Sequence, residues 1–386
     1  MIVNLLENPM EIWMREEKGK ILKAFYKLYP DLPFRMRNTL ISYEQGMPSN
    51  WHLEDDVWSH TMMVLHNVKF RRFDNMSKAA YKALFLTALM HDVGKVNRIS
   101  FEKYGKAGFP GHAHSATKYI APLCEQLYGY DHDYERILEL TLFAVSHHMN
   151  VHEVVPNFSK DDFMKYFNYD YEQMAVSIDF GYADIYGRLS GNELKFPEYP
   201  HITAITENMN KEKYQVSKDD IDCWVYCYPP GANILWYVDQ GHLDYVRVRV
   251  ETLLQIEAQS KSNQHLAARM TPYQLLKEMR KIKNIPELVL KEFKDRKDDD
   301  KFLILDFNLS KRPRSSFAHM IKNIYPNKKV GCKVIMPTLS KLYADNEYPR
   351  EGNISYELSD IYKELEEFVF PTMNDGFDRI EFRGPR

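Results

Sequence analysis

The sequence has few cysteines, no long apolar run and almost no net charge, and each shortage excludes a class of protein. Four cysteines in 386 residues are too few and too scattered for a disulfide framework, and Cys223 and Cys227 lie four apart instead of forming a CxxC pair. No run approaches the ~18 apolar residues of a membrane-spanning helix, and the first twenty residues turn charged after a short apolar stretch. We therefore expect reduced thiols and a cytoplasmic protein with no membrane partner.

The balance of charge limits the partners of the protein further. A formal charge of −3, from 51 basic and 54 acidic residues, creates no global field that would attract a polyanion. Hydrophobic residues make up 44% of the chain and aromatic residues 13%, which is enough to build cores and excludes a disordered or fibrous protein. At about 150 residues per domain, the length predicts two or three domains. Any contact with nucleic acid must then be local.

Two kinds of hydrophobic pattern divide the chain. Residues 76–90, 115–128 and 133–146 carry apolar residues at spacings of three and four, which predicts helices. After residue 200, the runs WVYCY (224–228) and KFLILDF (301–307) predict buried strands of a parallel sheet, separated by helical segments. We predict a helical extension over residues 1–50, an all-α domain over 51–200 and an α/β domain over 216–386.

Histidine is concentrated in the predicted all-α domain, which holds ten of the fourteen between residues 52 and 152. In TALMHDVGK (87–95), an apolar helix ends with adjacent His91 and Asp92, which can direct both side chains at one cation. Imidazole nitrogens mixed with carboxylate oxygens suit Mn, Fe, Co, Ni or Zn, and an oxygen-richer site would accept Mg. The candidate metal ligands follow the order H…HD…H…HH…D and are His60, His91, Asp92, His112, His147, His148 and Asp184.

This ordered set resembles the HD-domain metal-dependent phosphohydrolase superfamily over about residues 50–195. Three segments carry the resemblance: ALMHDVGK, FPGHAHSA and ADIYGR. They are similar to segments of the HD domains attached to bacterial tRNA nucleotidyltransferases and of the bifunctional HD-phosphohydrolase/polynucleotide kinases of RNA repair. The resemblance implies an all-α HD helical bundle that holds one or two divalent metal ions.

The resemblance also implies which side chains hold the metals. For the first metal the implied ligands are His60, His91, Asp92 and Asp184. For a second metal, or for the substrate phosphate, they are His112 and His147.

Three of these choices stay open in the sequence. His114 could replace His112, and His148 could replace or supplement His147. Asp179 is a rival of Asp184, which we prefer because its DxxGR context matches the family.

Such a site implies catalysis by a water molecule that the metal activates. A divalent metal lowers the pKa of bound water from about 15.7 towards neutrality, and the resulting hydroxide attacks phosphorus in line. Asp92 and Lys95 are the predicted catalytic residues, because Lys95 lies one helical turn past His91, where its ammonium group could bind phosphate oxygens or assist the leaving group. The predicted substrate-binding residues are Lys95, Arg98, His114 and Arg188.

The predicted α/β domain resembles a polynucleotide kinase whose phosphate loop has decayed. After the strand WVYCY comes PPGANILWY (229–237), in which Pro230 and Gly231 match a kinase loop, but Ile234 replaces the lysine and Leu235 the hydroxyl residue. LILDFNLSKRPRSSF and the tail FPTMNDGFDRIEF (370–382) are similar to later segments of these kinases. An isoleucine cannot neutralise phosphate, so we expect kinase activity to be absent or very weak in this P-loop-kinase-like fold.

Residues 307–344 carry eight basic side chains and no acidic one. Interleaved aromatic residues would let such a patch follow a nucleic-acid backbone, although a solvated basic face is an equal reading. The patch consists of Lys311, Arg312, Arg314, Lys322, Lys328, Lys329, Lys333 and Lys341, and we expect the first three to contact nucleic acid.

Three functions are compatible with these features. The leading hypothesis is a metal-dependent phosphohydrolase that removes a 2′-, 3′- or 2′,3′-cyclic phosphate from RNA ends, because both halves of the RNA-repair arrangement occur in the same order. A second is an HD nucleotidase or cyclic-nucleotide phosphodiesterase that acts on free nucleotides. The third is a non-catalytic protein that binds nucleic acid.

Overall fold

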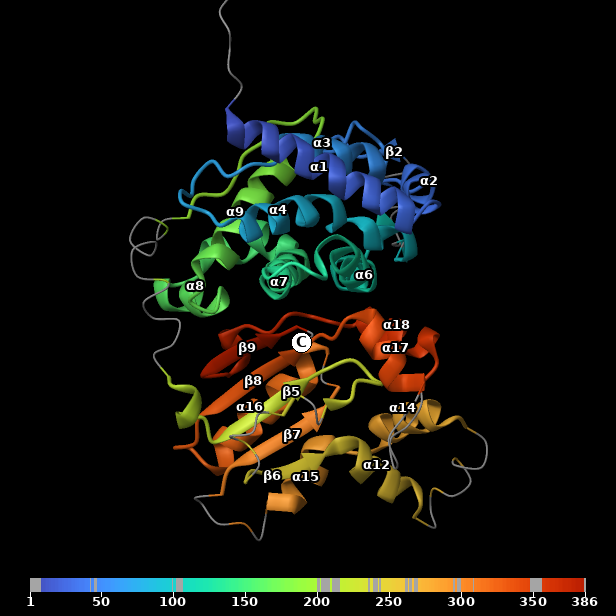
Figure 1. The fold of residues 1–386 in the computed structure, drawn as a ribbon, viewed down its shortest axis with the longest axis vertical. Helices are drawn as coiled ribbons and strands as arrows, with labels where there is room; N and C mark the ends of the chain where they lie inside the picture. Colours follow the sequence, from blue (N-terminus) through green and yellow to red (C-terminus); the bar gives the residue numbers. More distant parts are fainter. Residues whose placement is uncertain are drawn as a thin grey trace, which may run out of the picture. The chain divides into compact units, whose positions relative to one another are not determined.

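The chain forms two compact units in the computed structural model (Figure 1). The helical unit comprises Met1–Ser159 and Asp170–Thr206, and the α/β unit comprises Lys160–Tyr169 and Glu207–Arg386. The structure describes residues 8–41, 43–44, 47–98, 100–101, 107–199, 202, 209, 216–234, 237–238, 242, 244–260, 263, 266, 270–293, 296, 300–307, 309–347 and 356–384.

The helical unit is built around α7, which packs against α4, α6 and α9. Its helices are α1 (Pro9–Leu28), α2 (Leu32–Arg37), α3 (Val57–Asn67), α4 (Lys78–Met90), α5 (His112–Ser115), α6 (Thr117–Tyr128), α7 (Tyr134–Glu153) and α9 (Tyr171–Tyr186), with the 3₁₀ turns η1 (Val93–Asn97) and η2 (Val155–Asn157). Helix α1, which lies in the predicted helical extension, packs on α4 and α6 as part of this unit.

Four two-residue strands form a small antiparallel sheet beside these helices. They are β1 (Tyr43–Glu44), β2 (Met47–Pro48), β3 (Ser100–Phe101) and β4 (Ala107–Gly108), in the order β2-β1-β4-β3. The unit is therefore mainly, but not entirely, α-helical.

Side-chain caps define where the site-bearing helices begin. Asp56 accepts a hydrogen bond from the Ser59 amide at the start of α3, and Ser77 accepts one from the Ala80 amide at the start of α4. Each cap satisfies an amide that has no partner within its helix, and this typically contributes about 1 kcal/mol. The Asp56 cap lies four residues before His60, whose side chain is buried.

The α/β unit contains a five-stranded sheet in which all neighbouring strands are parallel. The strands are β5 (Cys223–Cys227), β6 (Val246–Arg249), β7 (Phe302–Asp306), β8 (Val330–Ile335) and β9 (Arg379–Arg383), in the order β6-β7-β5-β8-β9. The strands predicted at 224–228 and 301–307 correspond to β5 and β7. Every residue of β5, β7 and β8 is buried, as expected for central strands of a parallel sheet.

Helices and 3₁₀ turns make up the remaining regular structure described in this unit. They are α8 (Lys160–Tyr166), η3 (Lys218–Asp220), α12 (Val250–Ala258), α14 (Pro272–Ile282), α15 (Ile285–Phe293), α16 (Lys311–Ile324), α17 (Leu339–Glu347), α18 (Leu358–Leu365) and η6 (Met373–Asp375). Residues 160–169, predicted inside the first domain, group with this unit because α8 contacts η6. A helical unit followed by an α/β unit agrees with the coarse fold class predicted from the sequence.

Candidate metal centre

The His-Asp pair lies where α4 ends and η1 begins. His91 is the C-terminal cap of α4, and Asp92 immediately precedes η1. Most residues of α4 are buried, so the helix carries its C-terminal end into the interior, and His91 and Asp92 are 1% and 3% exposed. A buried carboxylate is tolerated only where charges or hydrogen bonds compensate it.

Two glycines bring His112 to this junction. A Cβ atom on Gly94 would lie 2.0 Å from the His112 carbonyl oxygen, so no larger residue would fit there. Helix α5 begins after Gly111, whose φ of 71° is a left-handed conformation that glycine adopts without strain. These positions explain in structural terms why the sequence reads HD-x-G-K and, later, PGH.

The two oxygens of Asp92 face different imidazoles. Oδ2 lies 3.3 Å from His91 Nε2 and 4.0 Å from His60 Nε2, while Oδ1 lies 3.2 Å from His112 Nε2 and 3.9 Å from His148 Nε2. Asp92 thus belongs to one group of potential ligands, with His112 and His148, and its Oδ2 faces a second group, which consists of His60, His91 and Asp184. Within each group the potential ligand atoms lie within 4.8 Å of one another.

Backbone carbonyl groups fix the tautomers of three of these histidines. Each Nδ1–H donates at 2.8–3.0 Å to the carbonyl oxygen three residues earlier, in the pairs His91 with Ala88, His112 with Phe109, and His148 with Val145. In a neutral ring this leaves the lone pair on Nε2.

Two of the resulting Nε2 atoms face each other. Those of His112 and His148 are 3.2 Å apart, and Nε2 of His91 is buried without a hydrogen-bond partner in the described part of the chain. Lone pairs that converge in the interior, on rings held by outer hydrogen bonds, fit a bound cation.

His60 lies between two carboxylates. Its Nδ1 is 2.8 Å from Glu54 Oε1 and its Nε2 is 2.9 Å from Asp184 Oδ1. The other oxygen of Asp184 accepts a hydrogen bond from His152 Nε2 at 3.2 Å. A ligating imidazole whose second nitrogen donates to a carboxylate is a common arrangement around protein-bound metals.

The surrounding charges favour ionised carboxylates. Burial opposes ionisation of Asp92, but the neighbouring ammonium group of Lys95 outweighs it and holds the pKa of Asp92 well below its usual range. Burial likewise opposes ionisation of Asp184, and Arg188 with the bonds from His152 and His60 lowers its pKa well below the usual range.

Two imidazoles of the centre respond to their surroundings in opposite directions. Burial disfavours protonation of His60, but its hydrogen bonds to Asp184 and Glu54 outweigh this and raise its pKa. Burial, together with neighbouring His112 and His91, lowers the pKa of His148 well below the usual value, which keeps its Nε2 lone pair available.

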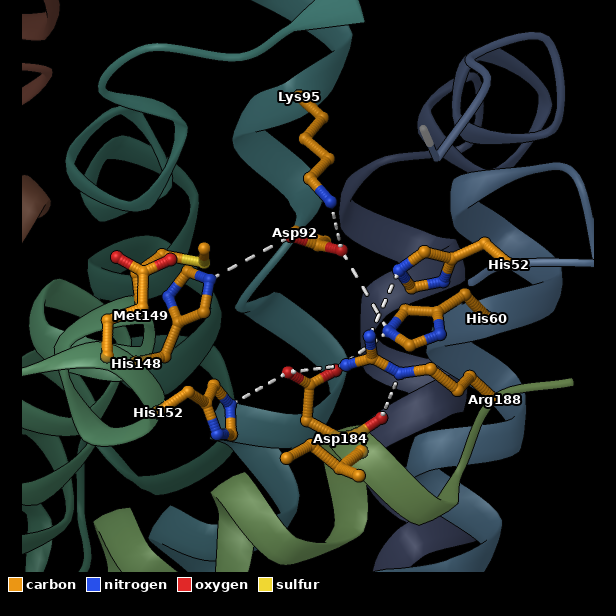
Figure 2. A pocket seen from close by; sticks show the side chains of 11 residues that line it. His52, His60, Asp92, Lys95, His148, Met149, His152, Asp184 and Arg188 are labelled. Atoms are coloured by element: carbon orange, nitrogen blue, oxygen red, sulfur yellow. Dashed lines mark hydrogen bonds and ion pairs between the residues drawn. The ribbon is translucent and has the colours of Figure 1, made fainter. Parts of the chain in front are cut away.

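A pocket of about 240 Å³ opens onto this cluster (Figure 2). Two cationic side chains reach it: Lys95 Nζ lies 2.8 Å from Asp92 Oδ2, and Arg188 Nη2 lies 3.4 Å from Asp184 Oδ2. The pocket is lined by His52, His60, Asp92, Lys95, His148, Met149, His152, Glu153, Asp184, Ile185 and Arg188.

The structure distinguishes between the histidines left open by the sequence. It brings His112 and His148 together at Asp92, and among the described residues neither His114 nor His147 belongs to a group of three potential ligands. The His147 ring instead packs against Phe143, with centroids 4.8 Å apart.

The other predicted site residues separate in the same way. Asp184 joins the cluster, whereas Asp179 accepts hydrogen bonds from the backbone amides of Arg71 and Arg72 at 3.0 and 3.4 Å. Lys95 and Arg188 line the pocket, while Arg98 and His114 are not among its lining residues.

The loop after β5 lies where a phosphate loop would be expected. Strand β5 is flanked by β7 and β8, so connections diverge from it, and ligands of open parallel sheets bind beyond the carboxyl ends of strands at such a point. Gly231 has a φ of 83°, the Asn233 amide donates to Asp345 Oδ2 at 3.4 Å, and Ile234 is buried. Leu235 lies outside the described residues. A carboxylate beside the loop is unfavourable for phosphate.

The predicted basic patch requires correction. Arg314 is fully buried, donates to the Leu309 carbonyl and pairs with Asp375, so it cannot contact a nucleic-acid backbone in this fold. Lys333 is also fully buried. Lys311 and Arg312 are exposed, but Lys311 pairs with Asp375 at 3.0 Å. Residues 307–344 contain no acidic residue, but in the fold an aspartate of the C-terminal tail, Asp375, balances part of their positive charge.

Sequence reasoning missed three residues of the site: His52, Glu54 and His152. His52 and His152 belong to the concentration of histidines, but nothing in their spacing distinguishes them from surface residues. Glu54 Oε1 lies 2.9 Å from His52 Nδ1 as well as 2.8 Å from His60 Nδ1. Despite burial, these hydrogen bonds lower the pKa of Glu54 to about 2.

In comparison with known protein families, no family model matches the chain. Among the described helices, none combines the length and apolar composition needed to cross a membrane.

Proposed function

We propose that the helical unit is a metal-dependent phosphohydrolase that acts on phosphate at RNA ends. The observation that carries this proposal is Asp92, whose two oxygens face two separate groups of imidazoles. Shared carboxylates of this kind suit a pair of divalent cations, and the mixed nitrogen and oxygen donors favour Mn, Fe, Co, Ni or Zn over Mg.

The residues present would hold such cations at two positions. His60, His91 and Asp184 would bind one, and His112 and His148 the other. Asp92, whose Oδ2 faces His91 and whose Oδ1 faces His112, would contribute to both. Bound divalent metals supply Lewis-acid activation of water and neutralise charge on phosphoryl oxygens.

The cationic side chains give the site its preference for phosphate. Lys95 and Arg188 both line the pocket, where an ammonium and a guanidinium group can bind non-bridging phosphate oxygens. The pocket volume of about 240 Å³ lies below the ~300–1,000 Å³ of sites that enclose a drug-sized ligand. A terminal phosphate and its sugar would therefore enter, and the remainder of the substrate would stay outside.

RNA ends are proposed as the substrate because the helical and α/β halves together resemble RNA-repair enzymes in the same order. Free nucleotides present the same phosphate and sugar, so they are the competing substrate class. The two classes differ in what lies outside the pocket, which substrate length can test.

The test is product formation by the full chain with Mn, Mg, Ni or Co added in turn. Substrates are oligoribonucleotides ending in 3′-phosphate, 2′-phosphate or 2′,3′-cyclic phosphate, beside the corresponding mononucleotides. Faster turnover of the oligonucleotides supports the proposal, and turnover of mononucleotides alone would move the protein to the nucleotidase class. Absence of metal binding and turnover would favour a non-catalytic binding protein.

A further inference from the structure

A closed ring of polar contacts joins the candidate metal ligands to the wall of the pocket, and Figure 2 shows four of its members, His52, His60, Asp184 and Arg188. His60 bridges Asp184 and Glu54, and Glu54 Oε1 also accepts from His52 Nδ1 at 2.9 Å. His52 Nε2 in turn accepts from Arg188 Nη1 at 3.2 Å, and Arg188 Nη2 returns to Asp184 Oδ2 at 3.4 Å. Four of these five residues also line the pocket.

Glu54 is held firmly enough to orient its neighbours. Its second oxygen accepts the Leu189 amide at 3.1 Å, and the Leu53 amide donates to the Leu189 carbonyl at 2.8 Å. These bonds attach the segment before α3 to the residues that follow α9. Because a carboxylate only accepts hydrogen bonds, both imidazoles must present Nδ1–H to it, which directs both Nε2 atoms away from Glu54.

The two Nε2 atoms serve different ends of the ring. That of His60 is directed at Asp184, among the candidate metal ligands, while that of His52 accepts from the Arg188 guanidinium. Arg188 also donates from Nε to the Asp184 carbonyl oxygen at 3.1 Å. These contacts use at most three of its five N–H groups, so donors are left for a phosphate in the pocket.

We propose that Glu54 and His52 are positioning residues, with Glu54 orienting His60 for the metal and, through His52, fixing Arg188 for the substrate phosphate. This inference rests on the proposed function of the same site. It makes one carboxylate responsible for two separable properties, the affinity for metal and the affinity for phosphate.

Substitutions at Glu54 and His52 should separate the affinity for metal from the affinity for phosphate. Glu54→Gln replaces one acceptor oxygen by a donor group, so at least one of its three partners loses its bond. Since outer partners of metal ligands typically contribute 10–100-fold to affinity, we expect Mn²⁺ affinity to fall by about 10–100-fold, and phosphate affinity with it. His52→Ala removes the acceptor for Arg188 and one donor to Glu54, but leaves the bond between Glu54 and His60 in place. It should therefore weaken phosphate binding about tenfold while Mn²⁺ affinity stays within about twofold.

A conservative replacement provides the rescue test. The side-chain amide of His52→Gln can donate to Glu54 and accept from Arg188, so it should recover most of the phosphate affinity lost in His52→Ala. His66→Ala, which removes an exposed histidine from the same helix as His60, is the matched control and should leave both affinities unchanged.

The experiment measures Mn²⁺ binding to the full-length variants by calorimetry, followed by binding of inorganic phosphate to the Mn²⁺-loaded proteins, with circular dichroism to verify folding. The inference is supported if Glu54→Gln loses both affinities, His52→Ala loses only phosphate, and His52→Gln regains it. It is overturned if Glu54→Gln binds Mn²⁺ like the wild type, or if His52→Gln behaves as His52→Ala. If Glu54→Gln does not fold, comparison of His52→Ala with His52→Gln still tests whether His52 positions Arg188 for phosphate.

Neither binding measurement requires turnover. A protein that passes both tests and hydrolyses no phosphate ester would contradict the proposed function alone. A protein that hydrolyses RNA ends with unchanged variants would contradict the positioning roles alone.

Discussion

In the helical unit the Nε2 atoms of His112 and His148 face each other beside a buried carboxylate, whereas at the carboxyl end of the parallel sheet Arg280 is paired with Asp306. The first arrangement leaves lone pairs converging on a space that a cation would complete. The second is complete within the protein, because the two terminal nitrogens of the guanidinium group, Nη1 and Nη2, each donate to one carboxylate oxygen. Both regions bury polar groups, and what separates them is whether the hydrogen-bonding capacity of these groups is already satisfied within the protein.

The same contrast holds for the two phosphate-site candidates. Lys95 and Arg188 reach a pocket in the helical unit. In the α/β unit, Lys341 pairs with Asp345 at 2.6 Å, and the same aspartate accepts the Asn233 amide. The first region retains cations beside an open pocket, and the second places a carboxylate where a phosphate loop would need positive charge.

Removing the shared carboxylate should have the largest effect. We expect Asp92→Asn to reduce phosphate release by about a thousand-fold, because outer partners of metal ligands alone cost ~10–100-fold and Asp92 serves both groups. Rates with saturating Mn²⁺ measure this effect. Asp31→Asn is the control, since Asp31 is an exposed helix cap that makes no side-chain capping bond. If Asp92→Asn kept an activity within about tenfold of wild type, Asp92 would not be a shared ligand of the metal centre.

Breaking the satisfied pair in the α/β unit should affect stability and not metal binding. Asp306→Ala leaves the Arg280 guanidinium without its partner, and the loss of one member of a buried pair typically costs about 3–5 kcal/mol. Urea unfolding measures the loss. Glu278→Ala breaks the more exposed pair with Lys281 in the same helix and should cost less than about 1 kcal/mol. Equal effects would show that Asp306 has no special structural role.

The decayed loop should not bind nucleoside triphosphates. Ile234 cannot supply the charge of a phosphate-loop lysine, and Asp345 opposes an anion, so calorimetry with Mg-ATP should detect no saturable binding below about 1 mM. Asp345→Asn should not restore binding, since the lysine is still missing. Submillimolar binding that depends on the loop would overturn this view of the α/β unit.

Substitution of Asp179 should have the smallest effect, a change in the pH dependence of the free energy of unfolding. Burial raises its pKa to about 6, against an ordinary value of 3.8, although the amides of Arg71 and Arg72 oppose the rise. The folded protein therefore holds this proton more tightly than the unfolded chain, and stability should fall as the pH rises from about 4 to 6. Asp179→Asn should remove this fall and gain on the order of 1–3 kcal/mol over wild type between pH 4 and pH 7. Parallel pH profiles of unfolding free energy would contradict it.

The sequence predicts the type of site, a metal centre, better than it predicts which residues form it. The HD pair and the concentration of histidines indicate a metal centre, but His147 and His148 point about 100° apart on a helix with apolar residues on several sides. Only the packing of α7 on α4 and α9 decides that His148 faces Asp92. Glu54 could not be predicted, because its role depends on how the fold orients two nearby imidazoles towards it and brings the Leu189 amide, 135 residues later, to its second oxygen.

Local patterns were similarly uneven in the α/β unit. The strands β5 and β7 can be predicted from their continuous apolar runs, since every side chain in them is buried. The basic patch misleads, because Arg314 and Lys333 read as surface residues in the sequence and are buried beside Asp375 and Glu381. Their counterions lie far along the chain, in a tail that only the fold brings close.

The most direct test of the account is the metal content of the wild-type chain after incubation with Mn²⁺ and removal of the excess, compared with Asp92→Asn. A carboxylate shared by two groups of imidazoles predicts two tightly bound Mn²⁺ ions per chain in the wild type and the loss of both in the variant. A wild type that binds none, or a variant that binds as many as the wild type, would contradict the claim that Asp92 unites a metal centre.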